Sequence, residues 1–216
     1  MSRLISTIGF IVCFSYPVWS HGALNNATPE LKNIYTKAHH QKPDHEYTRI
    51  KPFIDAKQRY REILAKLKDK HYKSLEINDA FSKLYLDSYI ESLDPQKSYF
   101  LKSDIAEFNK WNAKLDDFLL DGEISPGYEM YNRFLLRAED QLLKNLALLK
   151  SDFKFDLTAN EKLITDADKR AWINSPDEAM SFWHRRIKDS LIRLILNDKA
   201  PDAAKALITK RYENQL

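Results

Sequence analysis

Apolar residues recur every three to four positions along most of this chain, which is the spacing of amphipathic helices. The first stripe begins near Pro52 and ends in the basic run 66–73, the second spans about 78–93, and the third runs from Ser103 to Asp121-Gly122. The residues expected on the buried faces of these three helices are Phe53, Ala56, Tyr60, Ile63, Leu64 and Leu67, then Phe81, Leu84, Tyr85, Tyr89 and Leu93, then Ile105, Phe108, Trp111, Leu115, Phe118 and Leu119.

Helix-start signals divide the second half of the chain. Ser125-Pro126 predicts the start of the longest helix, while 158–161 and 175–178 each match a capping box. Pro201 opens a last helix whose apolar face is expected to be exposed, because the pattern is still periodic where the sequence stops. No segment alternates with the two-residue period of a strand. The predicted class is all-α, an irregular array of about six helices.

The most specific local feature is the corner formed by residues 93–104. Pro95 cannot continue a helix, so the helix that ends at Leu93 must stop, and Ser103 or Asp104 is expected to cap the next one. Large apolar groups in such a loop predict a corner that is buried rather than solvated. The corner residues to which we assign this structural role are Leu93, Asp94, Pro95, Ser98, Tyr99, Phe100, Ser103 and Asp104.

This corner resembles that of the N-terminal domain of the periplasmic tail-specific proteases, which belong to the C-terminal processing peptidase family. Similarity to that domain extends over roughly 47–216. The other matching positions follow in the family's order and are His71-Tyr72, Asn78-Asp79-Ala80-Phe81, Tyr131-Asn132, Trp172, the Trp183 helix and Thr209-Lys210-Arg211-Tyr212.

The resemblance implies a role in proteolysis that this chain would not carry out alone. In that family a serine activated by a lysine cuts the substrate and a PDZ domain holds its C-terminus, and no segment here matches either part. We therefore expect no catalytic residue and a chain truncated before the catalytic domain. It would act as a scaffold that meets apolar C-terminal tails, a protease or an adaptor. The alternative is a stand-alone periplasmic peptide-binding or chaperone-like protein.

An N-terminal leader predicts export. Residues 1–20 combine Arg3, an apolar run and the small-x-small ending Val18-Trp19-Ser20, which is typical of a signal peptide. Cys13 would leave with it, so the mature chain would hold no cysteine, as suits an oxidising compartment. We expect a flexible segment over 21–48 with one short helix near 30–38, a helical domain over 49–216, a periplasmic location and no integral membrane segment after processing.

Composition excludes several other classes. The chain has 34 basic and 31 acidic residues, which are interspersed and argue against a nucleic-acid partner. The histidine-rich stretch 39–46 could supply metal ligands, but Pro43 interrupts any regular face there, so no metal or other cofactor is expected. The basic runs 66–73 and 185–188 could attract anionic lipid, although solvated helix faces are the commoner explanation. Ser98 has only solvated lysines nearby and is interpreted as structural.

The leader makes a direct prediction. Signal peptidase should cut after Ser20, because small residues at positions 18 and 20 fit its pocket and the sequence that follows is polar. Mass spectrometry of the periplasmic fraction should therefore find a chain that begins at His21. A chain that retains Met1, or that stays in the cytoplasm, would contradict the prediction.

Overall fold

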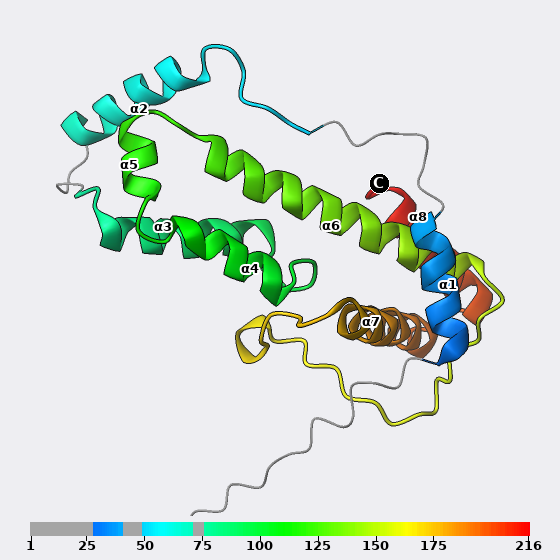
Figure 1. Cartoon of the computed structure of the whole chain (residues 1–216). Coiled ribbons are helices and arrows are strands. Elements are labelled where there is room, and N and C mark those ends of the chain that lie inside the picture. Colours follow the sequence, from blue (N-terminus) through cyan, green and yellow to red (C-terminus); the bar gives the residue numbers. More distant parts are fainter. Residues whose placement is uncertain (1–27, 41–48, 71–75) are drawn as a thin grey trace, which may run out of the picture.

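The protein is all-α. The computed structural model describes residues 28–40, 49–70 and 76–216, and within these ranges it contains helices and no strand, only one isolated parallel bridge between Leu101 and Ile173 (Figure 1). The helices are α1 (Pro29–His40), α2 (Ala56–Lys70), α3 (Asp79–Leu93), α4 (Lys102–Phe108), α5 (Leu115–Leu120), α6 (Ser125–Lys150), α7 (Pro176–Leu196) and α8 (Pro201–Glu213), with short 3-10 turns at Asn109–Trp111 and Ala167–Lys169.

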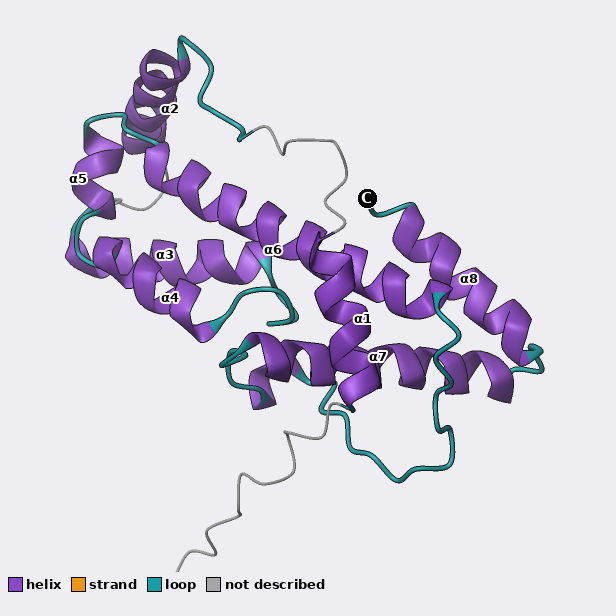
Figure 2. Ribbon diagram, turned by 45° about the vertical axis from the view of Figure 1, so that its right-hand side comes forward, coloured by secondary structure: helices purple, strands orange, loops and turns teal. Residues whose placement is uncertain are grey.

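The long helix α6 is the axis of the fold. At roughly 39 Å for its 26 residues, it is long enough to carry a separate group of helices at each end. Figures 1 and 2 both show α1, α7 and α8 around its C-terminal half and α3, α4 and α5 around its N-terminal half, with α2 beyond α5. Helix α6 contacts α1, α8 and α3 directly, while α7 packs on α8 and α5 packs on α3.

Three apolar clusters fill the spaces around this axis. The cluster at the α6 C-terminal half consists of Leu31, Tyr35, Leu148, Leu149, Met180, Ile187, Leu191, Ala204 and Ile208. The cluster at the N-terminal half consists of Leu86, Ile90, Phe100, Phe108, Trp111, Leu115 and Met130. A third cluster, around the bridge between the corner and α7, consists of Leu101, Ile173, Ala179, Phe182 and Trp183. The corner thus contributes Phe100 to one core and Leu101 to another.

Several helix boundaries follow the sequence closely. Ser175 caps α7 as predicted, because its Oγ accepts a hydrogen bond from the Glu178 N–H at 3.2 Å. Pro201 is the first residue of α8. Helix α6 begins at Ser125, which is its first residue and not its cap, and the Ser125 N–H instead donates to Glu123 Oε1 at 3.0 Å.

The single helix expected from Ser103 to Asp121 is wrong, because α4 and α5 are separate. The cause is a tertiary contact from α3. Ser82 Oγ accepts a hydrogen bond from the Asp116 N–H at 2.7 Å and donates to the Asp116 carboxylate at 2.6 Å. This buried serine satisfies a free N–H at the start of α5, as a capping residue would, so a new helix can begin there.

The same contact explains an error in α3. We expected Leu84 and Tyr85 on its buried face, but Leu84 is 71% exposed and Tyr85 is also exposed. The buried residues are Ser82, Leu86 and Ile90, which lie four apart on another face. A small polar residue at the centre of a buried face is invisible to an apolar pattern, and this serine is buried because Asp116 binds it.

Two further expectations are corrected near the C-terminus. No helix follows the predicted capping box at Thr158, because the Thr158 hydroxyl donates to Asp156 at 2.7 Å instead of accepting from a helix N–H. The apolar face of α8 is covered within the chain, with Ile208 buried and Tyr212 partly buried against the same cluster. The expected exposed docking face on α8 is therefore wrong.

Helix α1 corresponds to the short helix expected near 30–38, and it is more than a local turn. Leu31 and Tyr35 are buried against α6 and α7, and the Tyr35 hydroxyl lies 3.4 Å from Asn145 Oδ1 on α6. The predicted leader 1–20, the Ser20 cleavage site and most of the stretch 39–46 lie outside the described residues. Within the described residues, no helix is long and apolar enough to cross a membrane.

The burial of Phe100 gives the first structural prediction. Its ring contacts Phe108, Phe134 and Trp172 with centroid distances of 5.4, 5.9 and 6.3 Å, so Phe100→Ala should leave a cavity and lower the free energy of unfolding by about 3 kcal/mol. Chemical denaturation followed by circular dichroism measures this difference. The matched control is Leu84→Ala on exposed α3 surface, expected to cost less than about 0.5 kcal/mol. Equal stabilities for the two variants would contradict the assignment of Phe100 to the core.

Candidate functional site: a buried acidic corner and a tyrosine groove

The corner is organised around the carboxylate of Asp94, which ends α3. This buried side chain accepts hydrogen bonds from three consecutive backbone N–H groups, of Ser98 at 2.9 Å, Tyr99 at 2.8 Å and Phe100 at 3.0 Å. Lys97 adopts a left-handed conformation with φ of 44°, which costs of order 1 kcal/mol for a residue other than glycine. The carboxylate offsets that strain by satisfying N–H groups that would otherwise be buried without partners.

Trp183 on α7 closes the corner from the other side. Its Nε1–H donates to the Ser98 carbonyl oxygen at 2.9 Å, and its ring lies 5.2 Å from that of Tyr99 and 6.3 Å from that of Tyr212 on α8. The Arg186 guanidinium stacks over its outer face at 4.9 Å. One indole therefore joins the corner, α7 and α8, which makes Trp183 part of the core and not of a ligand-lining aromatic groove.

Asp104 fixes the far end of the corner to α6. Its fully buried carboxylate accepts the Leu101 N–H at 2.9 Å, Arg133 Nη1 at 2.6 Å, and Arg137 Nε and Nη2, both at 2.9 Å. The two arginines lie one turn apart on α6, so one carboxylate binds both. Burial alone would raise the pKa of Asp104, but the hydrogen bonds from Arg137, Leu101 and Arg133 outweigh it and hold the pKa below its ordinary value.

The structure thus separates the eight corner residues by position. Pro95 and Ser103 are exposed, and Ser103 is not the helix cap, because α4 begins at Lys102 with Leu101 as its N-cap. Asp104 is not the cap either. As the third residue of α4, it accepts a hydrogen bond from the N–H of the N-cap residue Leu101. The other corner residues are buried or half-buried and lie together, namely Leu93, Asp94, Ser98, Tyr99 and Phe100. The Ser98 hydroxyl lies 3.3 Å from the Asp94 carboxylate, in keeping with a structural role.

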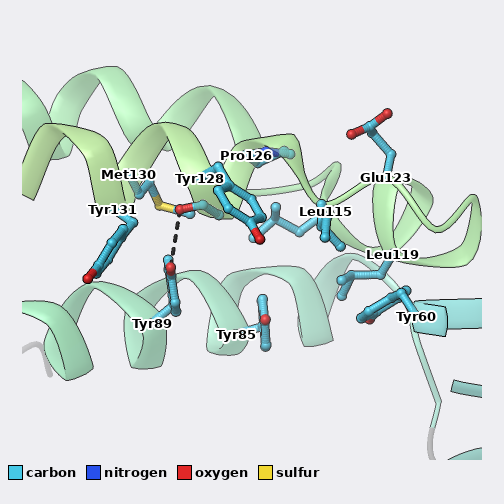
Figure 3. Close-up of a pocket in the computed structure, with 12 residues that line it drawn as sticks. Tyr60, Tyr85, Tyr89, Leu115, Leu119, Glu123, Pro126, Tyr128, Met130 and Tyr131 are labelled. Carbon is cyan, nitrogen blue, oxygen red and sulfur yellow. Dashed lines mark hydrogen bonds between the residues drawn. The ribbon is translucent and has the colours of Figure 1, made fainter. Parts of the chain in front are cut away.

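A groove lined by tyrosines lies on the other side of α3, where α2, α5 and α6 meet it (Figure 3). It encloses about 210 Å³. We call this feature the tyrosine groove, and its lining residues are Tyr60, Tyr85, Tyr89, Leu115, Leu119, Glu123, Ile124, Pro126, Gly127, Tyr128, Met130 and Tyr131.

The groove is aromatic and uncharged apart from Glu123. Burial raises the pKa of Tyr60 to about 12 and also raises the pKa values of Tyr85 and Tyr89, so these phenols stay protonated at neutral pH. The Tyr89 hydroxyl donates to the Gly127 carbonyl at 3.1 Å, which links the α3 and α6 walls of the groove (Figure 3). Such a groove suits an extended peptide with apolar side chains. The side chains can pack on the stacked rings, and the peptide backbone can form hydrogen bonds with the hydroxyl groups at the ring edges.

Sequence reasoning missed both the arginine pair and the groove. The arginines carried a weak signal, since Arg133 and Arg137 are four apart and therefore lie on one side of the long helix. The groove carried a weaker one. Its five tyrosines come from three helices, and each is ordinary as part of an amphipathic stripe, so only the tertiary arrangement brings them together.

Fold and site define the class of the molecule: an all-helical domain whose buried carboxylates hold its helices together. The chain belongs to the tail-specific protease N-terminal domain family, whose model matches residues 63–216. It is also similar to the tail-specific protease of Haemophilus influenzae, with 34% identity over 148 residues. That match covers 68% of this chain but 21% of the relative, so the chain spans about a fifth of the protein that it resembles.

The Asp104 network makes a pH-dependent prediction. Asp104→Asn should lower the free energy of unfolding at neutral pH by about 3 kcal/mol, because two arginines lose their shared charge partner. Because folding depresses the pKa of Asp104, its contribution is present above the ordinary aspartate pKa and is lost as the pH falls through the folded value. The stability gap between wild type and variant should therefore shrink in acid, as measured by urea denaturation across pH.

The control is Asp189→Asn, which removes a surface pair with Arg193 and should cost about 0.5 kcal/mol or less at any pH. A gap for Asp104→Asn that widens as the pH falls would contradict the assignment.

Proposed function

We propose that this chain is an exported, periplasmic helical domain of tail-specific proteolysis, acting as a scaffold and as a module that binds protein partners or substrate. The observation that carries the proposal is the family match over residues 63–216, which lies within the N-terminal domain of a protease. The leader 1–20 supports the periplasmic location. Cleavage itself belongs to the serine and lysine chemistry of the resembled family, for which this chain offers no matching segment.

The tyrosine groove is the proposed binding site. Its neutral phenols and apolar floor favour segments that are apolar and extended, which is the chemistry of the tails that the resembled family recognises. Tyrosine is well suited to such a site, because it offers a large contact area at a small cost in side-chain entropy. The corner would act as the scaffold, since Asp94 and Asp104 hold α3, α4 and α6 in the arrangement that shapes the groove.

A stand-alone peptide-binding protein is the second candidate, and one observation favours it. The tyrosine groove has an aromatic, largely uncharged lining, which suits a peptide through the groove's own chemistry. The two candidates differ in what lies beside the gene. A reading frame for a PDZ domain and a peptidase directly downstream would favour a role within a protease, whereas an unrelated neighbour would favour the independent protein.

The purified chain should bind a labelled peptide that ends in apolar residues and should leave it uncut. Tyr85→Ala and Tyr131→Ala should each weaken binding roughly tenfold, measured by fluorescence anisotropy, because each removes an aromatic wall. Leu196→Ala, on exposed surface outside the groove, is the control and should bind as the wild type does. Mass spectrometry of the peptide after incubation checks hydrolysis. The proposal would be overturned if both tyrosine variants bound the peptide with wild-type affinity. It would also be overturned if the chain cut the peptide and lost that activity when one of its own serines was mutated.

A further inference from the structure

Helix α2 is attached to the rest of the molecule along one narrow line. Only Ala56 and Leu64 of this helix are buried, and Arg61 Nε donates to the Asp121 carbonyl oxygen at 3.1 Å. Both overall views place α2 at one end of the molecule, beside α5 and the start of α6 and far from α7 and α8 (Figures 1 and 2). The side of α2 that carries Ile63 and Leu67 borders this line of contact and is left open to solvent among the described residues.

That side carries apolar residues in solvent. Ile63 is 56% exposed and Leu67 is 46% exposed, and their four-residue spacing places them on one face. The turn that leads into α2 adds Phe53 and Ile54, of which Ile54 is fully exposed. Four large apolar side chains on or beside one helix form a patch of the kind that marks an interaction site, whereas single exposed ones are ordinary.

Positive charge flanks this patch. Arg59, Lys66 and Lys70 are exposed and lie three or four residues from Ile63 or Leu67, so they border the apolar edge. None of the three forms an ion pair with another described residue, and the Arg59 guanidinium lies over the Phe53 ring at 5.4 Å. We call Phe53, Ile54, Arg59, Ile63, Lys66, Leu67 and Lys70 the outer face of α2.

The charge is local to this segment. Residues 49–70 hold eight Lys or Arg against three Asp or Glu, a net charge of +5. Since the whole chain has 34 basic and 31 acidic residues, the remainder has 26 and 28, a net charge of −2. The excess of positive charge is therefore concentrated in the segment that contains α2, where Ile63 and Leu67 are also exposed.

We propose that the outer face of α2 binds the surface of a membrane that contains anionic lipids. A helix with exposed apolar residues bordered by Lys and Arg lies in the headgroup region of such a bilayer, where the apolar side chains enter the acyl boundary and the cations meet phosphate groups. The sequence alone favoured a solvated basic run here. The structure changes that balance, because Ile63 and Leu67 face solvent and not the core.

The same features separate this ligand from other polyanions and from a protein. A nucleic acid or a soluble acidic polymer would use the cations and gain little from Ile54, Ile63 and Leu67. A second copy of the chain would bring the same positive charge to the contact, which would oppose pairing of two outer faces. A flat bilayer uses both the apolar edge and the cations, and the terminal position of α2 lets it reach a surface without a steric clash from α7 or α8.

The test is co-sedimentation of the purified chain with vesicles. The chain used in this test begins at His21, which is the form that export would yield. The apolar leader 1–20 therefore cannot contribute to vesicle binding. It should bind vesicles of phosphatidylglycerol and phosphatidylcholine, bind pure phosphatidylcholine at least tenfold more weakly, and lose affinity in high salt. The triple variant Arg59→Glu, Lys66→Glu, Lys70→Glu should reduce partitioning on the order of a hundredfold. Ile63→Ser with Leu67→Ser should reduce it roughly tenfold.

A matched control makes the same change in net charge at three exposed lysines outside α2. Lys154→Glu, Lys162→Glu, Lys199→Glu alters three exposed residues outside α2 and should bind vesicles nearly as the wild type does. Circular dichroism checks that all variants remain helical, which is expected because every changed residue is exposed. Equal losses in the two charge variants would overturn the proposal, as would unchanged binding of the serine variant. The proposal would also be overturned if the chain bound heparin as tightly as it binds vesicles. A wild-type chain that dimerises but does not bind vesicles, with a serine variant that is monomeric, would overturn it as well.

Discussion

The Asp94 carboxylate is the interaction on which the rest of the structure depends. When a proline ends a helix, the N–H groups of the turn that follows need partners, and here Ser98 and Phe100 are buried, so water cannot supply them. Three of those N–H groups point at one side chain. With the backbone of the turn satisfied, Tyr99 and Phe100 can enter the core, where an unsatisfied peptide group would otherwise oppose their burial.

Asp104 holds the end of the corner that lies beyond the N–H groups bound by Asp94. It binds the Leu101 N–H and holds α6 through Arg133 and Arg137, so the segment between the two aspartates is fixed at both ends. Buried ion pairs contribute little to stability compared with apolar packing of equal volume, and their better-supported role is to specify one arrangement. In this fold the specified arrangement is the crossing of α4 against α6, which also positions Phe108 in the core beside Phe100.

Local patterns anticipated those parts of the fold that local chemistry decides. Ser175 caps α7 through its own neighbour Glu178, and Asp94 binds the N–H groups of Ser98, Tyr99 and Phe100 within one short segment. The failures have two causes, which are contacts from far along the chain and competition by a neighbouring side chain for a capping hydroxyl. The break between α4 and α5 depends on Ser82, which is 34 residues away along the chain, and Thr158 caps no helix because Asp156 engages its hydroxyl. The tyrosine groove depends on four helices meeting, so no single stripe could indicate it.

Helix α2 links the two surfaces on which function is proposed. Tyr60 forms part of the groove wall, while Ile63, one turn further along the same helix, belongs to the outer face. The helix has little buried surface of its own, so its position is held by fewer contacts than that of α3 or α6. A ligand at the outer face that favoured one position of α2 would therefore change the affinity of the groove for its own ligand. Thermodynamic linkage makes that coupling reciprocal, so a peptide in the groove would alter binding at the outer face by the same factor.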